Sequence, residues 1–236
     1  LLDEAVGTAP SLALAFIPVI AVIIILYRWS LEAKNAVYAV VRMLAQLLLV
    51  GYVLAAIFQA KSAWIVMLVL LVMVTSASWI ALGAVKSQRL KLYRHAFWAI
   101  VLGGGLTLIL VTQGVIDLSP WFEPQYMIPL AGMIFANSMN SISLATERLY
   151  AELARDVAYE KAREIAFQAA FIPVVNSLFA VGLVSLPGMM TGQILSGVSP
   201  IVAAHYQIVV MCMIFGSAGL STAYFLAFAK PVISQD

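Results

Sequence analysis

The chain has 236 residues, of which 64% are hydrophobic and 10% are charged, and its formal net charge is +2 at pH 7. An ordinary soluble domain carries about one quarter charged residues, so this composition excludes a soluble protein. Apolar stretches of about 18 residues or more, which can cross a bilayer core of about 30 Å as helices, recur along the whole sequence. We therefore expect an all-α, polytopic transmembrane helical bundle that forms a single transmembrane domain over residues 1–236.

Seven apolar runs bounded by charged residues predict seven membrane-spanning helices. Their ranges are 11–27, 36–58, 63–85, 96–116, 126–145, 165–184 and 201–229. Alternate loops then lie on opposite sides of the membrane, and every loop Lys or Arg except Lys61 falls on the same side. Because Lys and Arg are enriched in cytoplasmic loops, the N-terminus is expected outside and the C-terminus in the cytoplasm.

The chain has a single cysteine, Cys212, which lies inside an apolar run. One cysteine excludes an internal disulfide and a thiolate-rich metal cluster. Cys212 is therefore expected to be a small buried hydrophobic residue.

The longest connection between predicted spans, residues 146–166, combines Glu with Arg or Lys at helical spacing. This pattern predicts a charged cytoplasmic helix or helix extension. The simpler interpretation is a solvated helix end with weak ion pairs, each stabilising by a few tenths of a kcal/mol. The functional interpretation is a docking surface for a cytoplasmic partner, and composition alone favours the simpler one.

The sequence lacks the motifs of an energy source or of an enzyme. It contains no G-x-x-x-x-G-K-[ST] phosphate loop, since the glycines of LGGGLTL at 102–108 are not followed by the required Lys. None of the seven spans contains the Asp or Glu that proton-coupled carriers commonly use, although sodium coupling through backbone carbonyls stays open. No nucleophile and base set occurs, and His95 and His205 lie far apart. We expect a transport subunit that is not itself an enzyme and carries no cofactor.

Neutral polar residues are concentrated in the fifth and sixth predicted spans. Asn137 and Asn140 lie three residues apart and hence on one helix face, and Asn176 follows in the next span. An unsatisfied amide in hydrocarbon costs several kcal/mol, so each must find a partner away from lipid. Interhelical hydrogen bonds, of about 1 kcal/mol or less per pair, are the simpler interpretation for any one residue. The two asparagines on one face favour a cavity lining, so all three are candidate pathway residues.

The stretch SLPGMMTGQI at 185–194 contains a proline and two glycines, so a continuous helix is not expected there. Irregular backbone at membrane depth persists only where it is buried in protein or lines a cavity. The stretch is therefore either a bent or re-entrant element at a pathway or a turn near the outer surface. In the first case Pro187, Gly188 and Gly192 form a hinge or exit gate. The side chains that would then line the pathway without fixed charge are Met189, Met190, Thr191 and Gln193.

Two groups of glycines predict close packing of helices, since small residues let backbones approach where lipid provides no hydrophobic drive. One is the run at 103–105. The other is the small-xxx-small pair Gly188 and Gly192.

Three long segments resemble a known family. GLVSLPGMMTGQILSG, followed by YQIVVMCMI at 206–214, closely resembles the carboxy-terminal signature of the FetB family of bacterial iron-export permeases, whose plant relatives act in aluminium tolerance. QLLLVGYVLAAIF at 46–58 and IPLAGMIFANSMNSISLATERL at 128–149 look like the corresponding earlier segments. The resemblance covers residues 31–228 and implies the permease subunit of an ABC transporter in the bacterial inner membrane.

The resemblance also implies partners. A separately encoded ATPase would bind and hydrolyse ATP, and the permease would act as a homodimer with two ATPases to export iron. The segment 146–166 then becomes the candidate ATPase contact, with Glu147, Arg148, Arg155 and Arg163 as coupling residues. Membrane lipid is a further partner, and nucleic acid is not. The substrate stays open among iron, another metal and, from the plant branch, a nucleotide sugar.

The chain departs from the family pattern in one place. Members have, before the sixth span, a stretch resembling E-x-x-L-x-L-G-A-[ST]-P, similar to the coupling loop of ABC importers. Here ELARDVAYEKAREIAFQAAFIP continues without it. Either the protein has lost this segment or the segment is missing from the sequence as determined. We prefer the second interpretation, because an ABC permease without a coupling element would not receive the ATP-driven conformational change of its ATPase.

The sequence thus predicts a seven-span ABC permease that exports a metal ion, with iron favoured. A sodium-coupled or facilitated carrier without an ATPase is the main alternative, and a non-transporting membrane scaffold is the second. The metal ligands stay unassigned. Methionine thioethers favour soft ions such as Cu(I), whereas iron sites usually contain oxygen or nitrogen.

Overall fold

The computed structural model describes residues 13–60 and 62–233. These residues form helices and connecting turns without any β-strand, apart from an isolated bridge between Val181 and Ser185. The all-α prediction is therefore confirmed. The chain divides into two compact units, Leu1–Gln59 and Ala60–Asp236.

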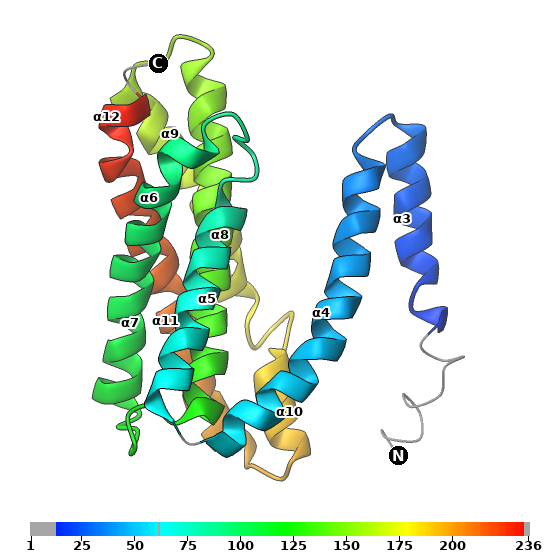
Figure 1. The fold of residues 1–236 in the computed structure, drawn as a ribbon, viewed down its shortest axis with the longest axis vertical. Helices are drawn as coiled ribbons and strands as arrows, with labels where there is room; N and C mark the ends of the chain where they lie inside the picture. Colours follow the sequence, from blue (N-terminus) through cyan, green and yellow to red (C-terminus); the bar gives the residue numbers. More distant parts are fainter. Residues whose placement is uncertain (1–12, 61, 234–236) are drawn as a thin grey trace. The chain divides into compact units, whose positions relative to one another are not determined.

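The first unit contains two antiparallel helices, α3 (Ile17–Arg28) and most of α4 (Ala33–Ala60) (Figure 1). The tight turn between them places Ser30 at φ 56° and lets the Leu31 N–H donate to the Leu26 carbonyl at 2.9 Å. No residue of α3 is buried, although the helix is almost entirely apolar. Such all-round apolar surfaces are typical of helices solvated by lipid or by other membrane helices.

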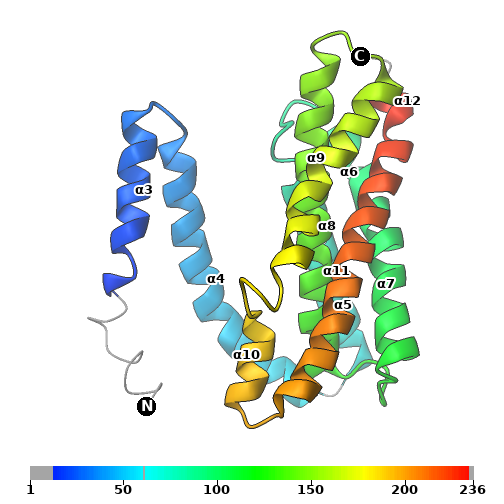
Figure 2. The same ribbon diagram turned by 180° about the vertical axis from the view of Figure 1, so that it is seen from behind.

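The second unit is a bundle of long helices (Figures 1 and 2). Its elements are α5 (Ala63–Ala81), α6 (Arg89–Ile100), η1 (Val101–Gly105), α7 (Leu106–Ile109), η2 (Leu110–Val115), α8 (Pro124–Leu153), α9 (Tyr159–Ala180), α10 (Gly188–Leu195), α11 (Pro200–Phe228) and α12 (Lys230–Ile233). The run from α6 to η2 is one continuous rod in which two π-helical segments widen the turns, a feature that is frequent at functional sites.

Five of the seven predicted spans correspond to helices that are long and apolar enough to cross a membrane. These are α4, α5, the rod from α6 to η2, α8 and α11. The first predicted span, 11–27, lies partly outside the described residues, and its described part is the shorter apolar helix α3. The sixth, 165–184, was predicted too long, because α9 ends at Ala180. Gly182 at φ 82° takes the backbone out of the helix there.

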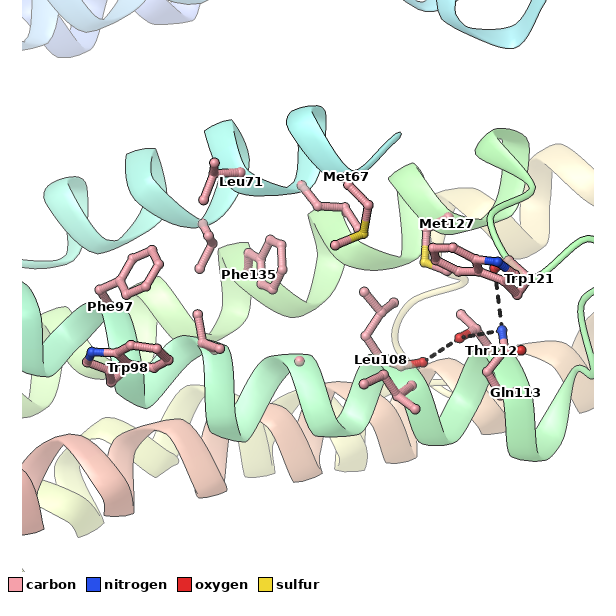
Figure 3. Close-up of a pocket in the computed structure, with 15 residues that line it drawn as sticks. Met67, Leu71, Phe97, Trp98, Leu108, Thr112, Gln113, Trp121, Met127 and Phe135 are labelled. Carbon is pink, nitrogen blue, oxygen red and sulfur yellow. Dashed lines mark hydrogen bonds between the residues drawn. The ribbon is translucent and has the colours of Figure 1, made fainter. Parts of the chain in front are cut away.

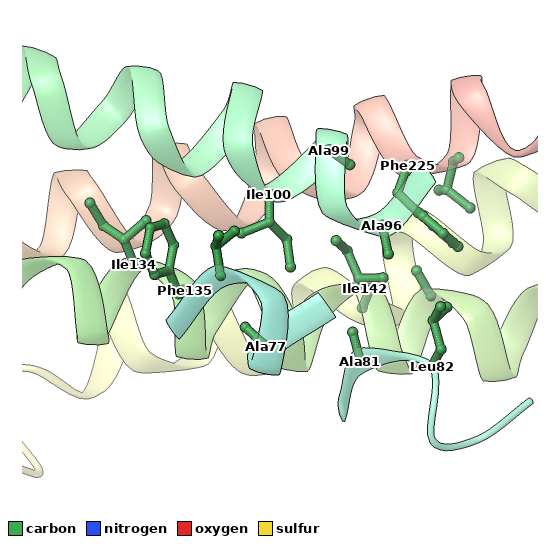
Figure 4. Close-up of a cluster of buried hydrophobic side chains, with 14 of the residues drawn as sticks. Ala77, Ala81, Leu82, Ala96, Ala99, Ile100, Ile134, Phe135, Ile142 and Phe225 are labelled. Carbon is green, nitrogen blue, oxygen red and sulfur yellow. The ribbon is translucent and has the colours of Figure 1, made fainter. Parts of the chain in front are cut away.

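The core of the second unit lies where α5, α6, α8 and α11 meet (Figure 4). Its largest fully buried side chains include Leu92, Ile100, Ile134 and Phe225. Cys212, expected among such residues, is instead exposed on α11, so the prediction of a buried cysteine was wrong.

Close approach of the rod to α11 at Gly103 and to α8 at Gly104 explains two glycines of the run at 103–105. A Cβ on Gly103 would lie 2.4 Å from the backbone nitrogen of Ser221, and a Cβ on Gly104 would lie 2.9 Å from Ile134 Cγ2. Gly105 has open space around it. The predicted close packing is therefore confirmed for Gly103 and Gly104. Glycine is required most strictly at position 103, because the atom that a side chain would meet there belongs to the backbone of Ser221.

The two ends of the second unit differ in charge. The α5–α6 loop, the α8–α9 link and α12 lie at one end, where the basic residues Lys86, Arg155 and Lys230 are found (Figures 1 and 2). The opposite end carries the η2–α8 loop with Asp117 and Glu123. This grouping agrees with the loop assignment from the sequence, and the direction of the bundle across the membrane stays a prediction.

Candidate functional site

The polar cluster of the fifth span divides between two faces of α8. Ser138 and Ser141 are buried. Ser138 Oγ donates to the Ser217 carbonyl of α11 at 3.3 Å and accepts from Ser221 Oγ at 3.1 Å. Ser138 therefore holds α8 against α11, as interhelical hydrogen bonds do in membranes.

The asparagines occupy the other face. Asn140 is exposed, and Asn137 is half-buried with its Nδ2 donating to the Met133 carbonyl at 2.8 Å. Both lie near the middle of the 30-residue α8, at the depth where hydrocarbon would surround an uncovered side chain. The expectation that they share a face is confirmed, and this face is not covered by the second unit.

Asn176 is exposed on α9, which packs directly against α8. Gln168, two turns earlier on α9, is also exposed. The second unit thus carries neutral amides on the uncovered surfaces of two adjacent membrane helices. Since amides do not face lipid without a large free-energy cost, these surfaces must meet water or further protein.

The stretch at 185–194 is a break followed by a short helix. After α9 ends, the carbonyl of Ala180 accepts from the N–H groups of Leu183, Val184 and Ser185, at 2.8 to 3.2 Å. Helix α10 then begins at Gly188, and α11 begins at Pro200 (Figure 2). The interruption expected from the sequence is confirmed. Membrane transporters commonly place such discontinuous helices at their binding sites.

Two glycines in this break have a role that sequence reasoning missed. Gly182 and Gly197 adopt φ of 82° and 95° and turn the chain before and after α10. The expected pair Gly188 and Gly192 behaves differently, because a Cβ on either would meet nothing within 4 Å. Close packing at this pair is therefore wrong for the described structure, and its role as a hinge with Pro187 stays a proposal.

The side chains of α10 that were predicted to line the pathway have different surroundings. Thr191 Oγ1 donates to the Pro187 carbonyl at 3.1 Å, so its hydroxyl bonds to the backbone of its own helix. Met189 and Met190 are partly buried, and Met190 lines a pocket against α11. The carboxamide oxygen of Gln193 is buried without a hydrogen-bond partner.

The charged segment at 146–166 consists of two helix ends, not one helix. Helix α8 ends at Leu153 and α9 begins at Tyr159, with Asp156 at φ 61° in the link. The expectation of a helix extension is confirmed for both helices. Arg163 pairs with Glu160 at 2.9 Å, and Glu147 is exposed.

Glu152 organises this end, although the sequence analysis did not include it among the coupling residues. It is 5% exposed and pairs with Arg148 at 2.5 Å and with Arg155 at 3.7 Å. The i,i+4 spacing of Arg148 and Glu152 was the available signal. Two of the four predicted coupling residues are therefore positioned by one buried carboxylate.

A contact between α9 and the C-terminal helices completes the charged end. Lys230 pairs with Glu160, and the Tyr159 hydroxyl donates to the Leu226 carbonyl of α11. Burial raises the pKa of Tyr159 to about 12, so the phenol stays protonated and remains a donor at physiological pH. The start of α9 is thus tied to the end of α11.

A pocket of about 510 Å³ lies among α5, the α6–η2 rod and α8 (Figure 3). Its walls include Leu71, Phe97, Trp98 and Phe135, and its polar end has Gln113 donating to the Trp121 carbonyl at 3.4 Å. None of the predicted pathway residues lines it. Its apolar walls suit a hydrocarbon chain and do not suit an ion.

No group of three or more His, Cys, Asp or Glu side chains that could hold a metal ion occurs within residues 13–60 and 62–233. The described polar surface includes neutral amides at membrane depth and charged groups at the ends of the second unit. Together with the long apolar helices, this defines a polytopic helical membrane protein.

Comparison with known proteins identifies the family. The chain belongs to the UPF0014 family, because the model described as "Uncharacterised protein family (UPF0014)" matches residues 9–232. The resemblance inferred from the sequence is thus confirmed. No solved structure matches the chain.

Several relatives cover most of the chain. The "Probable iron export permease protein FetB" of Escherichia coli is 36% identical over 242 residues, covering 94% of this chain and 92% of that protein. The "UPF0014 membrane protein slr1647" of Synechocystis is 37% identical over 196 residues, covering 77% of this chain and 76% of that protein. "Protein ALUMINUM SENSITIVE 3" of Arabidopsis thaliana is 32% identical over 229 residues, covering 89% and 81%.

Proposed function

We propose that the chain is the membrane-spanning permease subunit of an ABC transporter that exports a metal ion, with iron as the favoured substrate. The observation that carries this proposal is the similarity to a probable iron export permease along 94% of the chain. The partner ATPase would supply ATP binding and hydrolysis, since the sequence has no phosphate loop. The bacterial inner membrane is the proposed location.

The amide-bearing surfaces of α8 and α9 support a pathway. Asn137, Asn140 and Asn176 would offer carbonyl oxygens to a passing cation without a fixed charge to trap it. Because Asn140 and Asn176 are exposed on the second unit and Asn137 is only half-buried, the pathway is incomplete without further protein. A second copy of the permease, as a homodimer, is the proposed partner that closes it.

The charged end of α8 and α9 supports contact with the ATPase. Arg155 and Arg163 are accessible there, and Arg148 and Glu152 fix the end of α8.

The test is export of radioactive iron from proteoliposomes that contain the chain and the ATPase encoded with it. ATP-dependent iron export is expected from the wild type. Asn140→Leu should reduce it several-fold, whereas Leu144→Met, one turn along the same helix, should not. Export without ATP would favour a carrier. Absence of export for every metal tested, with both proteins folded, would favour a scaffold.

Coupling is tested in the same vesicles. Charge reversal by Arg155→Glu together with Arg163→Glu should uncouple ATP hydrolysis from export while the permease stays folded. Arg94→Glu, an exposed residue of α6 at the same end, is the matched control. Unchanged hydrolysis and export in the double variant would leave 146–166 as a solvated helix end.

The gate is tested by thiol labelling in a Cys212→Ser background. Met189→Cys, Thr191→Cys and Gln193→Cys should react with a membrane-impermeant reagent from outside, and the rate at one site or more should change when ATP is supplied. Uniform inertness in both states would mean that α10 is a buried turn.

A further inference from the structure

A second pocket, about 390 Å³ in volume, lies among α9, α10 and α11. Three sulfur-bearing side chains line it: Met190 from α10, and Met211 and Cys212 from α11. Helices α10 and α11 pack directly against each other, so the sulfur atoms come from two elements that meet at the pocket. Methionine side chains have three rotatable bonds and readily adjust toward a common ligand.

Gln207 provides a second, independent sign of a ligand. It lines the same pocket, is only 6% exposed, and its carboxamide oxygen has no hydrogen-bond partner. Buried polar oxygens in folded proteins are nearly always paired, so an unpaired one needs an explanation. Gln207 and Met211 are four residues apart on α11 and therefore lie on one helix face, one turn from each other.

The charge and softness of these donors select one class of ion. A thiolate and two thioethers are soft ligands, which favour Cu(I) over hard ions. One thiolate also neutralises one monovalent cation, so the complex carries no net charge among the apolar walls formed by Leu178, Ile208 and Phe215. A divalent ion would keep a positive charge at membrane depth.

We propose that this pocket is a binding site for a soft monovalent metal ion, Cu(I), held by the Cys212 thiolate and the Met190 and Met211 thioethers, with the Gln207 oxygen as a weaker ligand. On binding, the Cys212 S–H bond breaks, its proton goes to water, and the sulfur bonds to the ion without any transfer of electrons. This site is separate from the proposed export of iron, and its affinity for Cu(I) is measured on the purified chain without any transport assay. A negative binding result would therefore leave the proposed function unaffected.

The test is Cu(I) affinity of the purified full chain, measured anaerobically by competition with the chromophoric chelator bicinchoninate. One Cu(I) per chain is expected. Losing even an outer partner of a metal site costs about 10–100-fold in affinity, so Met190→Leu and Met211→Leu should each weaken binding at least about 10-fold. Cys212→Ser should weaken it more than either. Met→Leu conserves volume, so the variants should fold.

Met67→Leu is the matched control, because Met67 lines the other pocket and its loss should leave the affinity unchanged. Cys212 is the only cysteine of the chain, so its protection from maleimide by Ag(I) reports the same site. Wild-type affinity in the double variant Met190→Leu/Met211→Leu would show binding by an isolated thiol and overturn the proposal. Failure of the wild type to compete with the chelator would also overturn it.

Discussion

The contact between α8 and α11 and the break between α9 and α10 are built in opposite ways. At the first, Ser138 of α8 bonds to the backbone of α11, and the neighbouring Gly103 of η1 leaves no room for a methyl group beside Ser221. At the second, Leu183 is 90% exposed, and a Cβ on Gly188 would meet nothing within 4 Å. The same residue types, glycine and serine, serve tight packing in one place and an open chain in the other.

This difference separates a stable part of the bundle from a part that opens easily. Segments with few buried contacts have low local unfolding free energies, and elements that move during function are drawn from them. The α8–α11 contact therefore suits a fixed frame, and α10 suits a moving element. Four substitutions test this division, in order of decreasing expected effect, and a fifth with a smaller effect tests the charged end.

Gly103→Val should be the most destabilising change. Its Cβ would lie 2.4 Å from the backbone nitrogen of Ser221, and backbone cannot rotate away. Overpacking a tight core costs about 1–3 kcal/mol, and we expect the upper end here. Thermal unfolding in detergent measures it. Gly105→Val is the control, since the space around Gly105 is open. Equal melting temperatures for the two variants would contradict a tight contact at the rod.

Gly197→Ala should cost less, and Gly192→Ala should have the opposite sign. Gly197 is at φ 95°, where a side chain costs about 1–2 kcal/mol. Gly192 lies inside α10 with open space around it, so alanine there should stabilise by up to about 1 kcal/mol through helix propensity. The same melting experiment compares them. If Gly192→Ala is destabilising, α10 is more tightly packed than the structure indicates.

Ser138→Ala should cost about 0.6 kcal/mol, the average for an interhelical hydrogen bond in a membrane protein. It removes contacts to Ser217 and Ser221. Ser177→Ala is the control, because the Ser177 hydroxyl bonds only within α9, to the Val174 carbonyl at 2.7 Å. Unfolding free energies measured in the same detergent should differ between the two variants. If Ser177→Ala lowers the unfolding free energy at least as much as Ser138→Ala, the interhelical bonds of Ser138 are not what stabilises the bundle.

The sequence predicted the helices because their signals are local. Apolar length located five spans, and charge at helical spacing located the helix ends around residues 146–166. Proline and glycine predicted the break before α10, yet not its boundaries, since α9 already ends at Ala180, well before Pro187. Whether a glycine adopts a positive φ depends on where the following helix packs. That packing is a tertiary contact, so the local sequence does not reveal it.

The candidate site was less accessible to sequence reasoning. Spacing placed Asn137 and Asn140 on one face, and it had no means of showing that Ser138 bonds to α11. The grouping of Met190 with Gln207 and Cys212 joins residues from two helices, so it follows only from tertiary packing. The same holds for the pairing of Glu160 with Lys230, 70 residues apart.

The smallest effect is expected at that last pair. The hydrogen bond from Lys230 lowers the pKa of Glu160; desolvation opposes this, and the charges of Arg163 and Lys230 lower the pKa further. A carboxylate with a depressed pKa in the folded state contributes stability above its unfolded pKa and loses it as pH falls through the lowered value. Glu160→Gln should therefore melt slightly below the wild type at pH 7, and the two should converge on acidification, because the wild-type side chain then becomes neutral as well. Glu164→Gln is the control, since Glu164 pairs only with Lys161 on the same helix. A difference that persists at a pH where Glu160 is protonated would show that the α9–α12 contact depends on shape and not on charge.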